Sequence, residues 1–292
     1  MKQRTIQKPV EVVGIGLHKG VPVKLRLEPL MENSGIVFYR SDKGVSIPLD
    51  KDYVIDTKMA TVLGKERVII STIEHLMSAI YAFGIDNLRI VVDNDEIPIM
   101  DGSAISFVMM LKEAGIKELN APKKFLKITK KVEVKDKDKF AILLPSNEIN
   151  FDFEIKFNHP VIGHQKYNFK FSTKNYIEEI AKARTFGFLK EVQYLRSIGL
   201  ALGGSLENAI VLDDKGILND SLRFPNEFVR HKILDAIGDM SLLGYNFIGS
   251  YKAFASGHHL NHLLTKEVFA QNAYEIVEFD LQKEKSLAKV FS

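Results

Sequence analysis

The spacing of hydrophobic residues near the start of the chain is that of β-structure. Within 5–28, apolar and polar residues alternate in two runs, the second being VKLRLEP, and Gly14, Gly16 and Gly20 lie between them. Alternation with a period of two is typical of a strand with one buried face, and glycines favour a tight turn. The segment is therefore expected to form a β-hairpin.

A helical spacing follows further along the chain. Between Ile73 and Ile80, apolar residues recur three and four positions apart. This spacing predicts an amphipathic helix, which the hydroxyls of Ser71 or Thr72 can cap and which Gly84 ends. The apolar run LRIVVD comes next and predicts a strand.

The second half of the chain repeats this order of elements. KKVEV resembles KPVEV, FAILLP resembles VKLRLEP, and RHKILDAIGDMSLLG matches EHLMSAIYAFG as a His-bearing helix that ends at glycine. This order favours two similar β/α domains, 1–121 and 122–280, followed by a tail, 281–292, of unassigned role. Sheets that carry helices on one face give the α+β class.

The composition is that of a globular protein without a membrane span. The chain is 46% hydrophobic and 26% charged over 292 residues, and it has no cysteine. No apolar stretch approaches the roughly 18 residues needed to cross a bilayer, and the first residues lack the apolar core of a signal peptide. We therefore expect a cytoplasmic protein with no transmembrane segment, in which any metal binds to His, Asp or Glu.

The formal charge of +3 is too small to predict binding to nucleic acid. Basic residues gather in one place, where eight lysines lie between Lys123 and Lys139. The interleaved apolar residues favour a solvated hairpin whose lysines discourage edge pairing, and an anion site is the alternative.

Three patches contain residues that can carry chemistry, and the first lies on the helix predicted before Gly84. Glu74 and His75 are neighbours there, so their side chains project about 100° apart. In this geometry His75 can hold a metal while Glu74 reaches a water bound to it. A surface Glu-His pair is the alternative.

The second patch lies on the helix predicted around RHKILDAIGDM. His231 and Asp235 are four residues apart and can converge on one ion, and Asp239 lies one turn further. An exposed ion pair is the alternative. The apolar residues of this helix already define its buried face, and the three ionisable groups are stacked close to that face, which favours a functional site.

The third patch is the sequence SGH, in which Gly257 precedes His258 and makes the backbone flexible. Imidazole titrates near neutral pH, which suits a general acid or base, whereas a solvated loop histidine is the alternative. Together the patches contain three metal ligands, a carboxylate beside them and a spare histidine. That set predicts a mononuclear zinc hydrolase with its metal in a cleft between the two domains.

Eight strings resemble those of the UDP-3-O-acyl-N-acetylglucosamine deacetylase family and occur in the family's order along nearly the whole chain. They are GIGLHKG (14–20), STIEHLMSA (71–79), IMDGSA (99–104), FNHP (157–160), ARTFGF (183–188), GLALGGSLENAIVLDD (199–214), FVRHKILDAIGDM (228–240) and SGHHLN (256–261). The resemblance implies a zinc-dependent enzyme of lipid A biosynthesis in Gram-negative bacteria, which removes the acetyl group of UDP-linked, 3-O-acylated N-acetylglucosamine. It also implies a β-α-α-β sandwich of the two domains, with the helices inside and the active site at the domain interface.

The resemblance further implies which residues bind the metal and transfer protons. Zn²⁺ is expected on His75, His231 and Asp235. Glu74 corresponds to the general base and His258 to the general acid.

Other residues are implied to act around these groups. Asp239 orients the general acid, and Thr185 helps the metal to stabilise the oxyanion. The implied substrate contacts are Phe157 against the uracil, Lys139 near the diphosphate, and Phe186 and Lys232.

Two positions depart from the family pattern. Ala255 stands where a basic residue is frequent in the family, and Lys252 is the candidate to supply the substrate contact from that side. Asn226 stands at a position that is usually acidic. Neither position is among the implied metal ligands.

A fatty-acylated substrate also needs an apolar passage. Val192–Val211 combines aliphatic with small side chains, which permits a passage between a helix and a strand, and a buried βαβ crossover is the alternative. Two other classes stay open: a zinc amidase acting on a different acylated amide, and a non-catalytic sugar-nucleotide binding module. The presence of both Glu74 and His258 argues against the binding module, and a monomer is expected.

Overall fold

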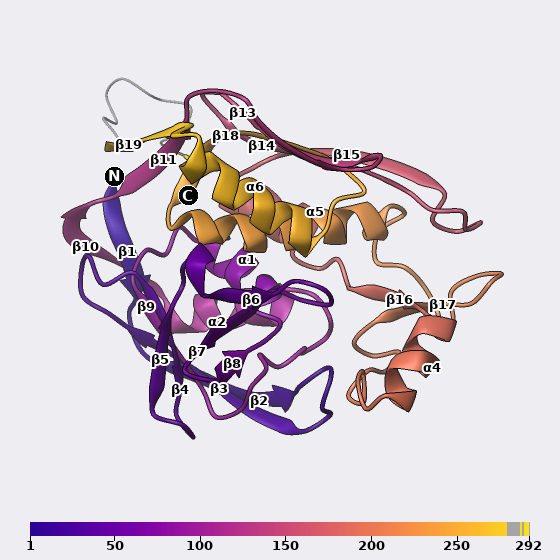
Figure 1. The fold of residues 1–292 in the computed structure, drawn as a ribbon. Coiled ribbons are helices and arrows are strands. Elements are labelled where there is room, and N and C mark those ends of the chain that lie inside the picture. The colour runs from indigo at the N-terminus through magenta and orange to yellow at the C-terminus, as the bar shows by residue number, and fades with distance from the viewer. Residues whose placement is uncertain (279–286, 288, 292) are drawn as a thin grey trace.

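The computed structural model describes residues 1–278, 287 and 289–291, which form a mixed α+β fold. Figure 1 shows helices α1 (Glu74–Ala82) and α5 (Glu227–Met240) lying between the two larger sheets. The α+β class predicted from the sequence is confirmed. Most of the predicted tail, 281–292, lies outside the described residues. Of the tail residues that the structure describes, Leu287, Val290 and Phe291 are buried.

The first half contains a five-stranded sheet that accounts for the alternation in the sequence. Its strands lie in the order β2-β3-β9-β4-β5. Their bounds are β2 Val10–Ile15, β3 Pro22–Pro29, β4 Ile36–Arg40, β5 Val45–Pro48 and β9 Leu88–Val92. β2 and β3 pair antiparallel, so the predicted hairpin is confirmed from Val10 onward, whereas Thr5 and Ile6 belong to a separate strand. The strand predicted at LRIVVD is also confirmed.

Two smaller sheets accompany it. A three-stranded sheet consists of β6 (Val54–Asp56), β7 (Val62–Lys65) and β8 (Val68–Ile70), and a 3₁₀ turn at Lys51–Tyr53 precedes it. The other sheet pairs β1 (Lys2–Ile6) antiparallel with β10 (Ile116–Pro122). Residue 121, the last of the first predicted domain, thus lies inside a strand that pairs with the N-terminal strand.

The large sheet of the second half has seven strands. Five lie in the order β12-β13-β18-β11-β19, and β14 pairs with both β18 and β15. Their bounds are β11 Lys124–Ile128, β12 Val132–Asp136, β13 Lys139–Leu144, β14 Ile149–Lys156, β15 His164–Lys170, β18 Asn246–Phe254 and β19 Tyr274–Glu278.

The basic cluster is only partly the solvated hairpin that the sequence predicts. β12 and β13 pair antiparallel, and Lys139 at the start of β13 is exposed. Lys123 is fully buried instead, and its Nζ lies 2.5 Å from Asp86 Oδ1 and 3.0 Å from the Gly84 carbonyl oxygen. The solvated interpretation is therefore wrong for Lys123, which forms an internal ion pair.

The remaining elements connect and cover these sheets. They are α2 Ile105–Ala114, α3 Thr173–Asn175 with a π turn at Tyr176–Ile180, β16 Phe186–Phe188, α4 Leu189–Ser197, β17 Ile210–Leu212, a 3₁₀ turn at Ser241–Leu243, and α6 His258–Ala270. β16 and β17 pair parallel and are joined through α4, a helix without a buried residue. Among the described residues, none of the helices combines the length and apolar character that a membrane crossing needs.

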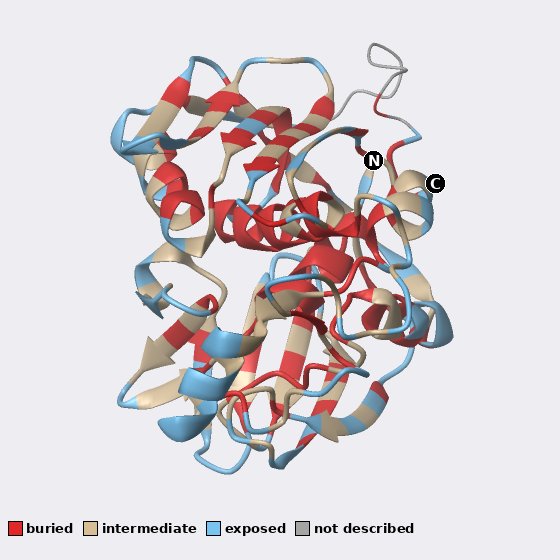
Figure 2. Ribbon diagram, turned by 90° about the vertical axis from the view of Figure 1, so that its right-hand side faces the viewer, coloured by how far each residue is buried: buried red, intermediate tan, exposed pale blue. Residues whose placement is uncertain are grey.

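α1 and α5 are buried at the centre of the molecule, where Figure 2 shows the helices almost entirely red. They meet at Gly238, because a Cβ there would lie 2.1 Å from the carbonyl oxygen of Glu74. Such a contact is sterically forbidden, so only glycine permits this approach of the two backbones. The crossing brings His75 on α1 next to His231 on α5, with ring centroids 4.9 Å apart.

The start of α1 differs from the prediction. Thr72 has a φ of 59°, and neither its hydroxyl nor that of Ser71 caps the helix, which follows Ile73 without a side-chain cap. Thr72 Oγ1 instead donates to Glu96 at 3.3 Å, so the capping prediction is wrong. Gly84 follows the end of the helix with a φ of 62°, as predicted from its lack of a side chain.

Candidate active site

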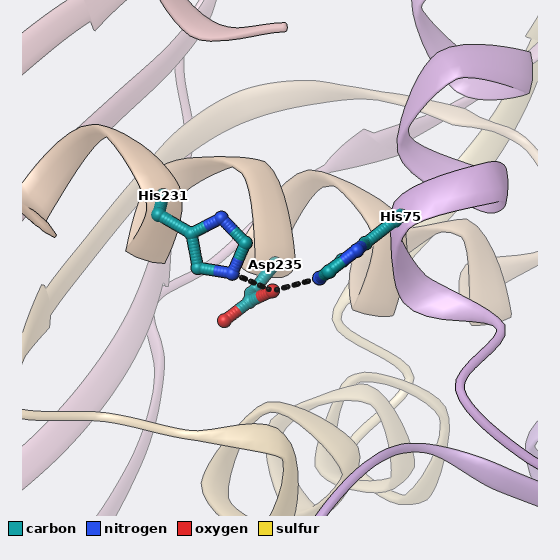
Figure 3. A group of neighbouring side chains, drawn as sticks. All are labelled: His75, His231 and Asp235. Carbon is teal, nitrogen blue, oxygen red and sulfur yellow. Dashed lines mark ion pairs between the residues drawn. The ribbon is translucent and has the colours of Figure 1, made fainter. Parts of the chain in front are cut away.

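Three potential metal ligands converge where α1 meets α5. His75 comes from α1, and His231 and Asp235 lie one turn apart on α5, with their side chains pointing toward one another in Figure 3. Asp235 Oδ1 lies 3.5 Å from His75 Nε2 and 3.3 Å from His231 Nε2. The three ligand atoms lie within 4.8 Å of one another, and all three residues are buried.

The chemistry of these atoms fits a bound metal. Asp235 Oδ1 is buried and has no hydrogen-bond partner among the described residues, which is costly for a carboxylate oxygen unless an ion binds it. His231 donates from Nδ1 to the Ala183 carbonyl oxygen at 2.9 Å, which leaves Nε2 as the free nitrogen. Burial lowers the pKa of His231 to about 4, so its ring is neutral, as a metal ligand must be.

The second oxygen of Asp235 is paired. Lys232 Nζ lies 2.8 Å from Asp235 Oδ2, three residues away on α5. Burial alone would raise the pKa of Asp235, but His231 and Lys232 outweigh it and hold that pKa well below its usual range. Asp235 is thus a carboxylate with one oxygen available to an ion.

A second carboxylate and a further imidazole lie beside the three ligands. Glu74 precedes His75 on α1, and its Oε1 lies 3.6 Å from His258 Nε2. Glu74 Oε2 accepts a hydrogen bond from the Thr61 backbone N–H at 3.1 Å. Burial raises the pKa of Glu74 and the nearby His258 opposes that shift, as expected for a carboxylate that exchanges protons.

His258 is held by Asp239. Its Nδ1 lies 2.9 Å from Asp239 Oδ2, which also accepts a hydrogen bond from Asn261 Nδ2 at 2.8 Å. Burial alone would lower the pKa of His258, but Asp239 and Glu74 outweigh it and raise the pKa to about 10. The ring is therefore protonated at neutral pH. His258 is the first residue of α6 rather than part of a flexible loop, so that detail of the prediction is wrong.

The residues predicted to contact substrate line one cavity together with His231, Asp235 and His258. Glu74, His75 and Asp239 are not part of its lining. Its volume is about 430 Å³. The predicted residues in its lining are Lys139, Phe157, Thr185, Phe186, His231, Lys232, Asp235 and His258. The Phe157 and Phe186 rings lie edge to face with centroids 5.9 Å apart, so two aromatic side chains form part of the wall.

An apolar cavity adjoins the first one and lies beside the segment predicted as a passage. It has a volume of about 410 Å³ and shares Met59, Thr185 and Phe186 with the polar cavity. Its other lining residues include Leu17, Val192, Leu195, Ala201, Leu206, Ala209 and Val211. The segment lies within a βαβ unit formed by β16, α4 and β17. Its helix α4 has no buried residue and borders the cavity, so the alternative of a buried crossover does not hold for α4.

The two departures from the family pattern lie at the edges of the site. Ala255 lines the polar cavity and has a φ of 48°. Lys252 on β18 is exposed and is not part of the described cavity lining. Asn226 Oδ1 accepts a hydrogen bond from Arg230 Nε at 2.6 Å, outside both cavities.

Three residues that contact the site, Thr61, Asn261 and Ala183, were not predicted from the sequence. Thr61 uses its backbone on Glu74 and its hydroxyl on Asp239, at 2.7 Å. Asn261 completes the environment of Asp239, and the Ala183 carbonyl orients His231. Asn261 follows His258 by three residues within SGHHLN, so helical spacing gave a usable signal for it, whereas Thr61 comes from a separate segment that carries no such pattern.

A buried set of two imidazoles and one carboxylate, with a second carboxylate and a protonated imidazole alongside, is typical of a metal-dependent hydrolase. The family model described as UDP-3-O-acyl N-acetylglycosamine deacetylase matches residues 3–270 of the chain. The chain therefore belongs to that family, and the resemblance found in the sequence is confirmed.

Similar proteins match over all or nearly all of the chain. A protein of Nautilia profundicola named UDP-3-O-acyl-N-acetylglucosamine deacetylase is 82% identical over 292 residues, which cover 100% of both chains. Proteins with the same name are 66% identical in a Nitratiruptor species, over 95% of this chain and 94% of the relative, and 61% identical in Campylobacter jejuni, over 100% of both chains.

Proposed function

We propose that the chain is a zinc-dependent deacetylase acting on UDP-3-O-(3-hydroxyacyl)-N-acetylglucosamine. Its products would be UDP-3-O-acyl-glucosamine and acetate, in the committed step of lipid A biosynthesis. The observation that carries the proposal is the buried cluster of His75, His231 and Asp235 beside Glu74 and His258, in a chain of the deacetylase family.

His75, His231 and Asp235 would hold the proposed zinc ion. Bound there, the ion would lower the pKa of a water molecule and would polarise the acetamide carbonyl. The unpartnered Asp235 Oδ1 and the hydrogen bond from His231 Nδ1 to Ala183 support this assignment.

Two residues move the protons in the proposed mechanism. Glu74 removes a proton from the attacking water, whose oxygen bonds to the acetamide carbon. His258 donates its proton to the sugar nitrogen as the carbon–nitrogen bond breaks, so that acetate and a free amine leave. Asp239 supports this step because it keeps His258 protonated and fixes the position of its Nδ1.

Thr185 is proposed to stabilise the oxyanion. It lines both cavities, and backbone hydrogen bonds to Gly102 and Ile210, each 2.8 Å long, fix its position. A hydroxyl placed at the developing negative charge contributes about 2.7–4 kcal/mol in comparable sites.

The cavities suggest where the parts of the substrate bind. In the polar cavity, Phe157 would stack on the uracil, Lys139 would lie near the diphosphate, and Phe186 and Lys232 would contact the sugar. The apolar cavity beside Val192–Val211 would take the acyl chain, since each buried methylene contributes about 0.8 kcal/mol.

The proposal extends to the organisation of the chain. We propose two β/α domains, 1–121 and 122–280, packed as a β-α-α-β sandwich with the site at their interface. The position of α1 and α5 between the two larger sheets supports this division. We further propose a monomer that works in the cytoplasm.

Two other functions can be separated by assay. A zinc amidase for a different acylated amide would not need an aromatic side chain such as Phe157 near a uracil. A sugar-nucleotide binding module would not need a buried Glu74 next to a protonated His258.

The decisive experiment measures acetate release from UDP-3-O-acyl-N-acetylglucosamine before and after metal removal by a chelator. We expect release by the zinc-loaded protein, loss of release after chelation, and recovery when zinc is added. Release that persists in fully metal-free protein contradicts the zinc proposal, and absence of release by the zinc-loaded protein contradicts the deacetylase proposal.

A further inference from the structure

The segment 183–185 connects the metal ligands to the proposed oxyanion site. Ala183 accepts the hydrogen bond from His231 Nδ1, and Thr185 lines both cavities two residues later. Arg184 lies between them and is 8% exposed, although it carries a full charge. Whatever holds Arg184 therefore fixes one metal ligand and one proposed catalytic group together.

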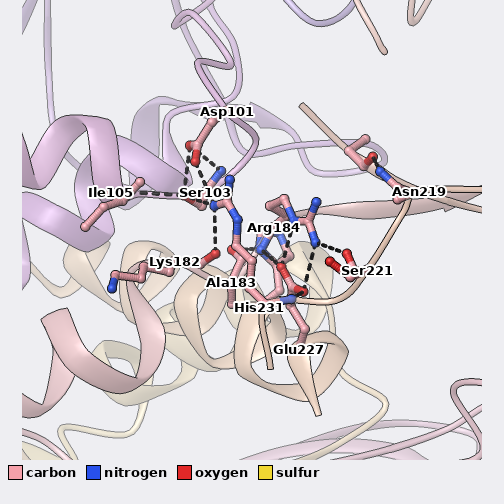
Figure 4. Close-up of polar contacts among 12 residues, drawn as sticks. Asp101, Ser103, Ile105, Lys182, Ala183, Arg184, Asn219, Ser221, Glu227 and His231 are labelled. Atoms are coloured by element: carbon pink, nitrogen blue, oxygen red, sulfur yellow. Dashed lines mark hydrogen bonds and ion pairs between the residues drawn. The ribbon is translucent and has the colours of Figure 1, made fainter. Parts of the chain in front are cut away.

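Arg184 is held by Glu227, which is fully buried in the first turn of α5. Glu227 Oε1 accepts hydrogen bonds from the Arg184 backbone N–H and from Arg184 Nε, both at 2.9 Å. Glu227 Oε2 accepts from Arg184 Nη2 at 3.2 Å and from the Arg223 backbone N–H at 2.6 Å. Figure 4 shows these contacts around His231.

The contacts close a ring that includes a metal ligand. Glu227 and His231 are four residues apart on α5, so they project from the same side of the helix. His231 bonds to the Ala183 carbonyl, and the next N–H, that of Arg184, bonds back to Glu227. The turn of α5 from Glu227 to His231 is thus bonded at both of its ends to the single peptide group between Ala183 and Arg184.

We propose that Glu227 and Arg184 are positioning residues, which set the orientation of His231 and the location of Thr185. This inference rests on the proposed function. A bidentate Arg–carboxylate pair has a defined geometry. A hydrogen bond made by the non-ligating nitrogen of a metal-binding histidine fixes the tautomer and the orientation of the ring. Moving Arg184 moves the Ala183 carbonyl, so the effect reaches His231 through the backbone.

A second contact ties the same ring to the first half of the chain. Arg223, whose N–H binds Glu227, donates from Nη1 to Asp101 Oδ2 at 2.7 Å and to the Lys182 carbonyl oxygen at 3.0 Å. Thr185 N–H donates to the Gly102 carbonyl oxygen at 2.8 Å, in the same loop as Asp101. The position of Thr185 therefore depends on both halves of the chain.

A merely structural ion pair would have a different signature. Burying two charges carries a desolvation cost, and many buried pairs can be replaced without loss of stability. A structural role predicts a change in the thermal midpoint alone. A positioning role predicts a change in metal binding and in kcat as well.

The test uses the full-length protein and two variants, Arg184→Lys and Glu227→Gln. Lysine keeps the positive charge but lacks the planar fork, so Arg184→Lys tests geometry in a protein that retains its buried charge pair. Glu28→Gln is the matched control, because Glu28 also pairs with an arginine, Arg26, at 2.8 Å but lies on β3 away from the cavities.

Three measurements are compared with the parent protein. Zinc affinity is obtained by chelator competition, the ligand geometry by the visible absorption of the Co²⁺-loaded protein, and kcat and KM separately by acetate release. For both variants we expect zinc affinity and kcat to fall by roughly 10–100-fold and the Co²⁺ spectrum to change, with a smaller change in KM. Glu28→Gln is expected to match the parent protein in all three.

The outcomes separate this inference from the function on which it rests. Unchanged zinc affinity and an unchanged Co²⁺ spectrum in Arg184→Lys overturn the positioning role. A fall in the thermal midpoint of this variant does not alter that conclusion, because a purely structural role predicts the same fall. Arg184→Lys decides alone if Glu227→Gln fails to fold. A parent protein that binds zinc and releases no acetate contradicts the proposed function only, because metal affinity and the Co²⁺ spectrum need no substrate.

Discussion

Replacing Asp239 by asparagine tests how the proposed general acid keeps its proton. Asp239 Oδ2 lies 2.9 Å from His258 Nδ1 and is the largest influence that raises the pKa of His258, against the opposite effect of burial. That pKa is raised to about 10, so the acid is lost only as the pH rises through this value. The parent enzyme should therefore keep kcat/KM through neutral pH and lose it on the alkaline side.

Asparagine preserves the shape of Asp239 but removes its charge. An opposite charge at this distance typically changes a pKa by about 1–3 units, so the alkaline limb should move by that amount toward neutral pH. The measurement is kcat/KM for acetate release as a function of pH, from about pH 6 to about pH 10.5. The zinc content of the protein is determined at each pH. Asp220→Asn, an exposed substitution, serves as the control and should leave the limb in place. An alkaline limb that stays at its parental pH in Asp239→Asn, with zinc still bound, would refute the role assigned to this carboxylate.

Four other predictions concern the proposed site, the apolar cavity and the buried Lys123–Asp86 ion pair. Glu74→Gln should keep its zinc and lose about 10²–10⁴-fold in kcat, and full activity would exclude Glu74 as the base. His231→Ala should bind zinc far more weakly in chelator competition, and parental affinity would remove His231 from the ligand set. Substrate without its acyl chain should show a much lower kcat/KM, and equal values would exclude the apolar cavity as the acyl site. Lys123→Met should lower the free energy of unfolding in urea by about 3–5 kcal/mol because it leaves Asp86 unpaired, whereas an effect no larger than that of the control Lys124→Met would contradict this.

The elements that carry the proposed metal ligands could be predicted because their signals are local. Apolar spacing and a following glycine marked both α1 and α5, and the interval of four residues brought His231 and Asp235 to one side of α5. The strands of the first hairpin were equally readable from alternation. Which residues approach one another across the chain was implied by the family resemblance, since local spacing has no information on the contact of α1 with α5.

The errors have physical causes of the same kind. Thr72 has the residue type of a helix cap, but its hydroxyl donates a hydrogen bond to Glu96, 24 positions away. The backbone of Thr72 also has a positive φ. Nothing in the sequence distinguishes Lys123 from the neighbouring lysines of the basic cluster. It is nevertheless buried, because Asp86 compensates its charge in the interior. His258 was expected in a loop, although Leu260, Leu264 and Val268 recur at helical spacing immediately after it.

The contact at Gly238 also couples the backbone of α5 to the position of His75 on α1. Two backbones that already touch cannot come closer, and any side chain at this position would force them apart and separate His75 from His231. A substitution at position 238 would therefore disturb the proposed metal site without altering any of its side-chain donors. The geometry of that site thus depends on a residue that contributes no ligand atom.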